Sequence, residues 1–301
     1  MWRDPSWGSV AVHGGELAVA TWGRGPHSVV GLHGITANHA SFGEVAAALA
    51  RRYAEVTLHV PDLRGRGRSA GLPGPFGLAR HADDVLALID GLGLARPTLL
   101  GHSMGAYVAA LVARRAPGRV GGVVLVDGGL PLEVDLPEGT SDLDAIHAVV
   151  GPAIDRLRTT YPDEAAHEAT FRQHPALTGR WTATLSAYTA ADRVPTEDGR
   201  WRSPVSIEAV AADGAGPLRD PEVRRAAAEL AVPATLLTAP RGLRDEPGGL
   251  CTADAVADLA VANRHVRIGT VADVNHYTIV FDPRAADQVA AAVLDVGQVR
   301  V

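Results

Sequence analysis

A serine and a histidine far apart in the sequence, Ser103 and His276, are the side chains with the most evident capacity for chemistry. Ser103 is the centre of a Gly-x-Ser-x-Gly motif at 101–105, which follows the apolar segment 97–100 and precedes a run of small residues typical of a helix. A serine hydroxyl is a poor nucleophile at neutral pH, so it needs a nearby base and an acid that orients that base. This pattern predicts nucleophilic catalysis by Ser103.

The residues around Ser103 indicate how its hydroxyl is presented. A sharp strand-to-helix turn lifts the hydroxyl out of the sheet, and the two motif glycines leave room where side chains would clash with backbone. The same turn places the amide of Met104 at a helix N-terminus. The amide of Ile35, in the turn after the segment 28–32, is the second predicted donor. Together the two amides are expected to stabilise an oxyanion.

His276 is the predicted base among the 12 histidines of the chain. It lies in the loop 273–279, just after the predicted last strand and before the predicted C-terminal helix. From that position its side chain can return over Ser103. The pair then matches the serine–histidine unit of nucleophilic hydrolysis.

The acid that orients His276 has three candidates. Asp245 is favoured, because it follows the predicted strand 234–238 and gives the chain order Ser, Asp, His. Glu246 is adjacent to it, and Asp127 ends another predicted strand. Whichever carboxylate acts must hold the imidazole in one tautomer and stabilise the imidazolium.

Short apolar segments and helical patterns alternate along most of the chain, which indicates an α/β fold with a mostly parallel sheet flanked by helices. Strands are predicted over 8–20, 28–32, 56–60, 97–100, 120–126, 234–238 and 266–271, and helices over 41–52, 79–92, 106–116, 253–262 and 285–295. The alternation breaks over 131–220, which predicts an inserted helical lid between a first core part, 1–130, and a second, 221–301.

The predicted lid holds a large share of the few aromatic residues in the chain. Trp181 and Tyr188, together with His39 from the turn region, are candidates for a substrate pocket. The alternative for the aromatic residues is packing of the lid onto the core, and for His39 stabilisation of its loop. The segment 194–200 is expected to be a solvated loop.

Composition narrows the functional classes. A net charge of -6 and a pI near 6.0 argue against nucleic-acid and anionic-membrane partners, which require clustered positive charge. Without an N-terminal apolar region or a membrane-spanning run, a cytoplasmic protein is expected. The single cysteine cannot form an internal disulfide, and no residue spacing suggests a metal or a cofactor. No motif indicates an oligomeric state.

Four motifs together resemble the α/β-hydrolase superfamily, in particular serine esterases and lipases with a helical lid. They are Leu-His-Gly at 32–34, the Asp- and Arg-rich loop 62–69, the motif at 101–105 and Asn-His-Tyr at 275–277. The resemblance covers nearly all of the chain outside the lid. It implies an eight-stranded sheet, a Ser-His-acid triad and a structural role for the loop 62–69. The segment leading to Asp245 is longer than is usual in this family.

The predicted function is therefore a cofactor-free serine hydrolase that cleaves an ester or a lactone through an acyl-enzyme intermediate. Its predicted partner is a small, apolar, ester-like substrate. The resemblance argues against an epoxide hydrolase or a haloalkane dehalogenase, because those relatives use an aspartate where this chain has Ser103. A C–C bond hydrolase of a diketone-like substrate and a ligand-binding receptor that does not turn over are the alternatives.

Overall fold

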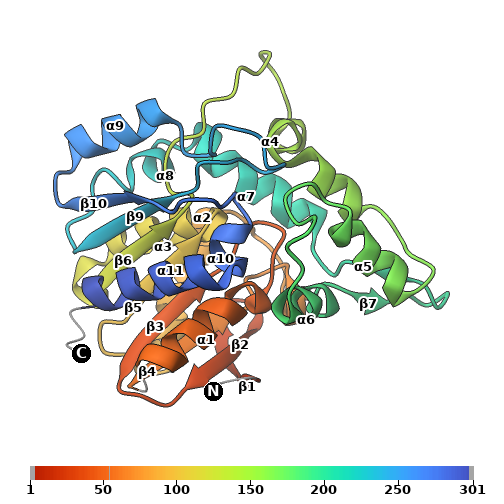
Figure 1. The fold of residues 1–301 in the computed structure, drawn as a ribbon, viewed down its shortest axis with the longest axis horizontal. Helices are drawn as coiled ribbons and strands as arrows, with labels where there is room; N and C mark the ends of the chain where they lie inside the picture. Colours follow the sequence, from red (N-terminus) through yellow and green to blue (C-terminus); the bar gives the residue numbers. More distant parts are fainter. Residues whose placement is uncertain (1–3, 54, 298–301) are drawn as a thin grey trace.

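The computed structural model describes residues 4–53 and 55–297; residues 1–3, 54 and 298–301, at the ends and within the predicted core parts, lie outside this description. Eight strands form one sheet in the order β1-β2-β4-β3-β5-β6-β9-β10 (Figure 1). Strand β2 is antiparallel to β1 and β4, and the other neighbouring strands are parallel. The mostly parallel sheet predicted from the alternating pattern is confirmed. The strands are β1 (Ser6–Val12), β2 (Gly15–Gly23), β3 (His27–Leu32), β4 (Val56–Pro61), β5 (Thr98–His102), β6 (Gly122–Val126), β9 (Ala234–Thr238) and β10 (Val266–Thr270).

The predicted strand 8–20 is two strands. β1 and β2 form an antiparallel hairpin in which Val12 pairs with Gly15, and Gly14 in the turn has a φ of +85°. A left-handed backbone conformation favours glycine, so the Gly-Gly pair at 14–15 is the signal for a turn. The hairpin supplies the strand that the sequence-based count lacked.

Helices cover both faces of the sheet. On one face α1 (Gly43–Arg52) packs against α11 (Pro283–Val296), and on the other α2 (Leu78–Gly91) packs against α3 (Met104–Arg115). Strands β5, β6 and β9 are buried along their whole length. This burial explains their continuous apolar runs, because a central parallel strand is covered on both faces.

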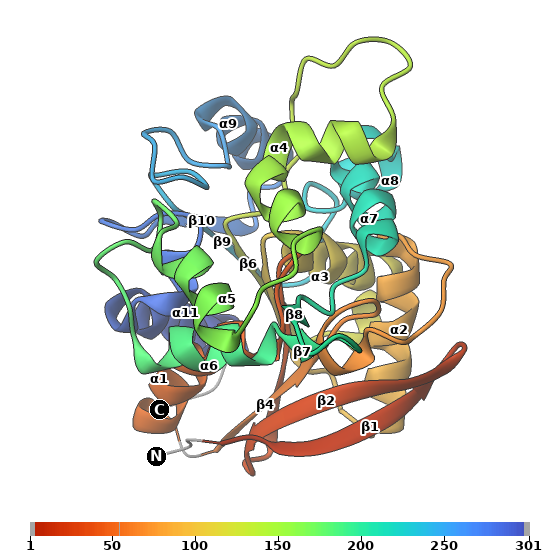
Figure 2. The same cartoon turned by 90° about the vertical axis from the view of Figure 1, so that its right-hand side faces the viewer.

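The segment between β6 and β9 is mainly helical. Helices α4, α5, α6 and α7 follow each other there and lie to one side of the sheet (Figures 1 and 2). Within the predicted loop 194–200 the chain starts a short antiparallel ribbon, in which Val194 pairs with Arg202. The elements are α4 (Asp142–Leu157), α5 (Glu164–Arg172), α6 (Ala183–Ala191), β7 (Val194–Pro195), β8 (Trp201–Arg202), α7 (Ile207–Arg219) and α8 (Pro221–Arg225).

The remaining helices complete the second half of the core. They are α9 (Ala253–Ala262), after β9, and α10 (Thr278–Phe281), which follows β10, and 3₁₀ turns occur at His39–Phe42, Gly67–Ser69 and Pro117–Arg119. None of the helices within residues 4–53 and 55–297 combines the length and the apolar character needed to cross a bilayer.

Candidate active site

Ser103 occupies a strained turn between β5 and α3. Its φ of +56° and ψ of -121° lie outside the regions that L-residues prefer. A Cβ atom at Gly101 would collide with the carbonyl of Gly105, and one at Gly105 would collide with the carbonyl of Leu32. The two motif glycines are therefore required by close backbone contacts, and the turn has the geometry predicted from the sequence.

His276 lies against the serine hydroxyl. Its Nε2 atom is 3.0 Å from the Oγ atom of Ser103. The histidine is buried and lies in the turn that connects β10 to α10. Its backbone amide donates to the carbonyl of Arg241 at 3.1 Å, which fixes the loop against the segment after β9. The structure thus brings together the two residues that the sequence singled out.

The carboxylate beside His276 is Asp127, not Asp245. Oδ2 of Asp127 is 2.7 Å from Nδ1 of His276, and Oδ1 accepts the amide of Ala239 at 3.0 Å. Asp127 directly follows β6, has a φ of +44° and is fully buried. These contacts orient the imidazole with its proton on Nδ1 and leave Nε2 free to accept the proton of Ser103.

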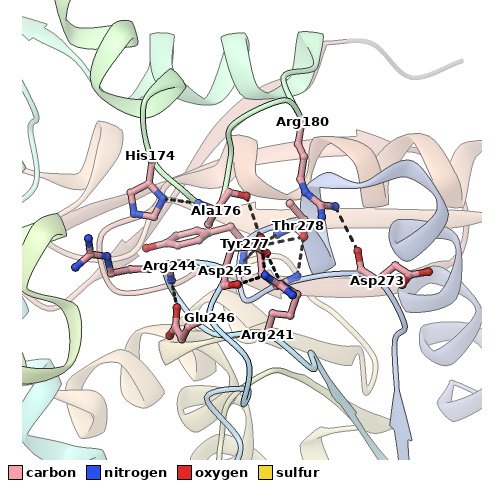
Figure 3. Close-up of polar contacts among 11 residues, drawn as sticks. His174, Ala176, Arg180, Arg241, Arg244, Asp245, Glu246, Asp273, Tyr277 and Thr278 are labelled. Carbon is pink, nitrogen blue, oxygen red and sulfur yellow. Dashed lines mark hydrogen bonds and ion pairs between the residues drawn. The ribbon is translucent and has the colours of Figure 1, made fainter.

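Asp245 and Glu246, the other two candidate acids, bind other partners. Asp245 accepts hydrogen bonds from Arg241 Nε at 2.8 Å and from Asn275 Nδ2 at 2.9 Å. These two donors lower the pKa of Asp245, mainly through the Arg241 side chain. Glu246 accepts the amide of Arg244 at 2.7 Å. The preference for Asp245 was wrong in geometry: Arg241, four residues before it, binds its carboxylate (Figure 3), and the carboxylate that contacts His276 is that of Asp127.

Asn275 fixes the loop that carries His276. Its Oδ1 atom accepts the amides of Tyr277 at 3.1 Å and Thr278 at 2.9 Å. Its Nδ2 atom donates to Asp245 and to the carbonyl of Ala176, in the segment between α5 and α6, at 2.9 Å. Sequence reasoning quoted Asn275 only as part of a motif. The available signal was Asn followed three residues later by Thr, a pattern of side-chain bonding to the local backbone.

His102, at the end of β5, also supports the loop that carries His276. No pattern in the sequence indicated this role. Its Nε2 atom donates to the carbonyl of His276 at 2.8 Å. Complete burial, aided by the neighbouring His276, lowers the pKa of His102 to about 3. The side chain is therefore neutral at pH 7 and serves as a fixed donor.

The two predicted oxyanion donors lie beside Ser103. Ile35 and Met104 both line the cavity that contains the serine hydroxyl. A Cβ atom at Gly34, the residue before Ile35, would be 3.4 Å from the Cβ of Ser103, so the turn approaches the serine closely. Within the described residues neither amide donates to another backbone group. Unpaired N–H groups at this position are suited to an oxyanion.

Arg66 supports this turn. The fully buried guanidinium donates to the carbonyl of Ile35 at 2.9 Å and lies 3.8 Å from the sulfur of Met104. It also pairs with Asp213 of α7 at 2.5 Å. Burial raises the pKa of Asp213, but His81 and Arg66 outweigh it and lower the value to about 2. The pair therefore ties helix α7 to the predicted oxyanion donors.

His33 connects the same turn to the loop 62–69. Its Nδ1 atom lies 2.8 Å from the carbonyl of Gly34, and its Nε2 atom accepts the amide of Leu63 at 3.0 Å. Burial lowers its pKa to about 4, so the ring is neutral at pH 7. These contacts agree with the structural role expected for this loop.

A cavity of about 70 Å³ surrounds the Ser103 hydroxyl and His276. Its other walls are mainly apolar, with side chains of α4, Leu243 and Leu250, together with Tyr188 of α6 and Asp213 of α7. Of the three predicted pocket residues, Tyr188 alone lines this cavity. Within the described part of the chain, no group of three or more histidine, cysteine or acidic side chains could hold a metal ion.

His39 and Trp181 lie elsewhere. His39 Nδ1 is 2.9 Å from Asp62 Oδ1, and its ring packs edge-on against Trp7. Trp181 donates to Ser186 at 2.9 Å. The pocket prediction was wrong for both: neither lines the cavity at Ser103, because His39 binds Asp62 of the loop 62–69 and Trp181 binds Ser186 of α6.

Comparisons with known proteins show which fold family the chain resembles. A family model described as the alpha/beta hydrolase fold matches residues 28–205. Lipase LipV of Mycobacterium tuberculosis is 32% identical over 119 residues, which are 39% of this chain and 44% of the lipase. The 2-(acetamidomethylene)succinate hydrolase of Mesorhizobium japonicum is 33% identical over 134 residues, 44% of this chain and 45% of that protein.

A solved structure shows the same architecture over the whole chain. The crystal structure of an E-2-(acetamidomethylene)succinate hydrolase superposes with a TM-score of 0.78 over 97% of this chain and 98% of its own. At 22% identity this likeness concerns the fold alone. The sequence matches span only 44% and 45% of the length of these two curated relatives.

Proposed function

Because the chain belongs to the alpha/beta hydrolase fold family, we propose that it is a serine hydrolase that cleaves a carboxylic ester or a lactone through an acyl-enzyme intermediate. One observation carries the proposal. An unbroken series of contacts runs from Asp127 through His276 to Ser103, with distances of 2.7 and 3.0 Å. In this series an acid orients the base and the base contacts the nucleophile, as covalent catalysis by serine requires.

In the acylation half of the proposed reaction, Ser103 Oγ attacks the ester carbonyl carbon while His276 Nε2 takes the hydroxyl proton. Asp127 stabilises the resulting imidazolium through Nδ1 and stays ionised. The amides of Ile35 and Met104 receive the oxyanion of the tetrahedral intermediate. When the intermediate collapses, the C–O bond to the alcohol breaks and His276 returns its proton to the leaving oxygen.

Water completes the cycle. It attacks the acyl carbon of the ester on Ser103, and His276 takes a proton from it as general base. The second tetrahedral intermediate uses the same two amides, and its collapse returns the proton to Ser103 and releases the acid. None of these steps calls for an electron acceptor or a group carrier.

Two observations favour an ester as the substrate. The walls around Ser103 are largely apolar, which suits the acyl chain of an ester. A relative that matches 39% of the chain carries the name lipase. The receptor alternative has no separate observation in its favour, and the labelling experiment distinguishes it from an enzyme.

The test is covalent labelling with a fluorophosphonate, read by intact mass and peptide mapping. We expect one label per chain, on Ser103, and hydrolysis of 4-nitrophenyl butyrate. The Ser103→Ala variant should take up no label and lose about 10⁶-fold in turnover. A folded protein that neither labels nor hydrolyses esters would overturn the proposal and favour a receptor.

A further inference from the structure

A second chamber adjoins the cavity at Ser103. Its volume is about 220 Å³, and it lies between α4, α5, α6 and the residues that follow His276. The two spaces share walls, including Ala153, Tyr188, Tyr277 and Phe281. A substrate whose ester lies at Ser103 can therefore extend its far end toward this chamber. Unlike the first cavity, the chamber has a buried cation in its wall.

That cation is Arg156 of α4. Its side chain is 8% exposed and lines the chamber. One nitrogen, Nη1, pairs with Asp192, and the guanidinium carbon lies 4.6 Å from the centre of the Phe171 ring. The guanidinium makes no other hydrogen bond to the residues that the structure describes. A buried arginine normally satisfies more of its five N–H donors than this.

Asp192 does not occupy the chamber. One of its oxygens takes the Arg156 contact, and the other accepts the hydroxyl of Ser203 at 3.0 Å. Burial lowers the pKa of Arg156, but Asp192 outweighs it and raises the value, so the guanidinium stays charged. The aspartate compensates the buried charge from behind, while the other guanidinium nitrogens remain available.

Three further polar side chains of the chamber can donate hydrogen bonds. Among the described residues, the hydroxyls of Tyr188 and Tyr277 have no hydrogen-bond partner, although both side chains line the chamber. His174 Nδ1 accepts the amide of Ala176 at 3.3 Å, so the proton of the neutral ring is on Nε2. The walls contain no aspartate or glutamate. An anionic acceptor is the ligand that such a set of donors matches.

We propose that this chamber binds a carboxylate at the end of the substrate remote from the scissile ester, with Arg156 as its main partner. This inference rests on the proposed function and names its substrate class, an ester with an apolar spacer and a terminal carboxylate. A planar guanidinium with free N–H groups is well suited to a carboxylate. The tyrosine hydroxyls add two donors.

Two matched substrate series test the proposal. In the first, 4-nitrophenyl monoesters of four- to eight-carbon dicarboxylic acids are compared with the same compounds capped as methyl esters. In the second, butyrate esters of ω-hydroxy acids are compared with their methyl esters, which places the carboxylate on the alcohol side. In one series kcat/KM should favour the free carboxylate by about 10- to 100-fold, mostly through KM. The favoured series shows which part of the substrate enters the chamber.

Variants assign the preference to Arg156. Arg156→Gln should reduce the ratio of kcat/KM between free acid and methyl ester to about one. Because this change leaves Asp192 buried without its partner, the double variant Arg156→Gln with Asp192→Asn removes both charges and should show the same loss in a folded protein. Arg172→Gln is the matched control, since this arginine lies on α5 with its side chain 49% exposed and paired with Glu168. It should keep the wild-type ratio.

The outcomes separate the two proposals. If Ser103 labels and neutral esters are hydrolysed but neither series prefers the free acid, the carboxylate site is disproved and the hydrolase remains. A preference that survives in the folded double variant also disproves it. If the protein shows no turnover, adipate should slow the fluorophosphonate labelling of Ser103 in the wild type but not in the double variant. That result would support the carboxylate site, and labelling that adipate does not slow would disprove it. Failure of Ser103 to label at all counts against the proposed function itself.

Discussion

Asp127 and Asp245 follow neighbouring strands of one sheet, yet their side chains have different surroundings. Both have a left-handed backbone, with φ of +44° and +67°. Asp127 is fully buried and contacts His276, whereas the side chain of Asp245 is 27% exposed and pairs with Arg241. Similar positions along the chain therefore do not establish similar roles.

The strand that leads to Asp245 also holds Asp127. The amide of Asp127 donates to the carbonyl of Leu237 in β9, and the amide of Ala239, just after β9, donates back to its carboxylate at 3.0 Å. Asp245 instead reaches His276 indirectly, through Asn275. One aspartate orients the ring of His276, and the other helps to hold its backbone.

The largest expected effect separates the two aspartates directly. Asp127→Asn should lower kcat for 4-nitrophenyl butyrate by about 10⁴-fold, because an amide at this position favours the imidazole tautomer that cannot accept the serine proton. Steady-state kinetics, with circular dichroism as the folding control, checks this. A larger loss in Asp245→Asn than in Asp127→Asn would reverse the assignment of the acid.

Asn275→Ala comes second. The change removes the acceptor for the amides of Tyr277 and Thr278, so the loop that carries His276 should shift. A displacement of about 1 Å in a catalytic group costs about 10²-fold, and we expect kcat and the rate of fluorophosphonate labelling to fall by up to that amount. Asn263→Ala, at another buried asparagine that bonds Leu230 rather than this loop, is the control. Equal losses in both variants would indicate a general loss of stability instead.

Asp245→Asn should have a smaller effect, below about tenfold in kcat. Its ion pair with the partly exposed Arg241 contributes at most about 1 kcal/mol to stability, and an asparagine can still accept one hydrogen bond. Urea unfolding and kinetics on the same preparation check both values. A loss approaching that of Asp127→Asn would show that the Asp245–Asn275 contact is essential for positioning His276.

We expect the smallest effect on activity from a change at His102, which donates to the carbonyl of His276. The quantity to measure is the dependence of the free energy of unfolding on pH. Unfolded histidines bind protons near pH 6.5, whereas folded His33 and His102 do so only near about 4 and about 3. The unfolded state therefore binds more protons below pH 6.5. Stability should fall as pH is lowered from 6.5 toward about 4, by about 1.4 kcal/mol per pH unit for each of these residues.

Urea unfolding at pH 7, 6 and 5 measures this slope. His102→Gln should remove about half of the contribution from the two buried histidines, because glutamine can still donate a hydrogen bond but does not titrate in this range. An unchanged slope in the variant would mean that His102 does not remain neutral in the folded protein.

Local sequence was sufficient to predict the turn at Ser103. The flanking strand, the two glycines and the helix that follows act over a dozen residues, and each requirement is visible as a residue type. The same holds for most of the strands and helices, whose apolar patterns reflect burial in a covered sheet. The hairpin turn at 14–15 was missed because apolar residues continue on both sides of the glycine pair, so the two strands were predicted as one.

The sequence by itself determined most of the strands, the presentation of Ser103 and the identity of His276 as its candidate partner. Only the tertiary structure placed Asp127 beside His276, because that contact joins residues 149 positions apart. It also showed that Asp245 binds Arg241, four residues before it. It likewise placed His39 and Trp181 outside the cavity and Arg156 in the adjoining chamber. The direction in which a polar side chain points depends on which partner lies nearest in three dimensions, and sequence patterns record burial more directly than they record partners.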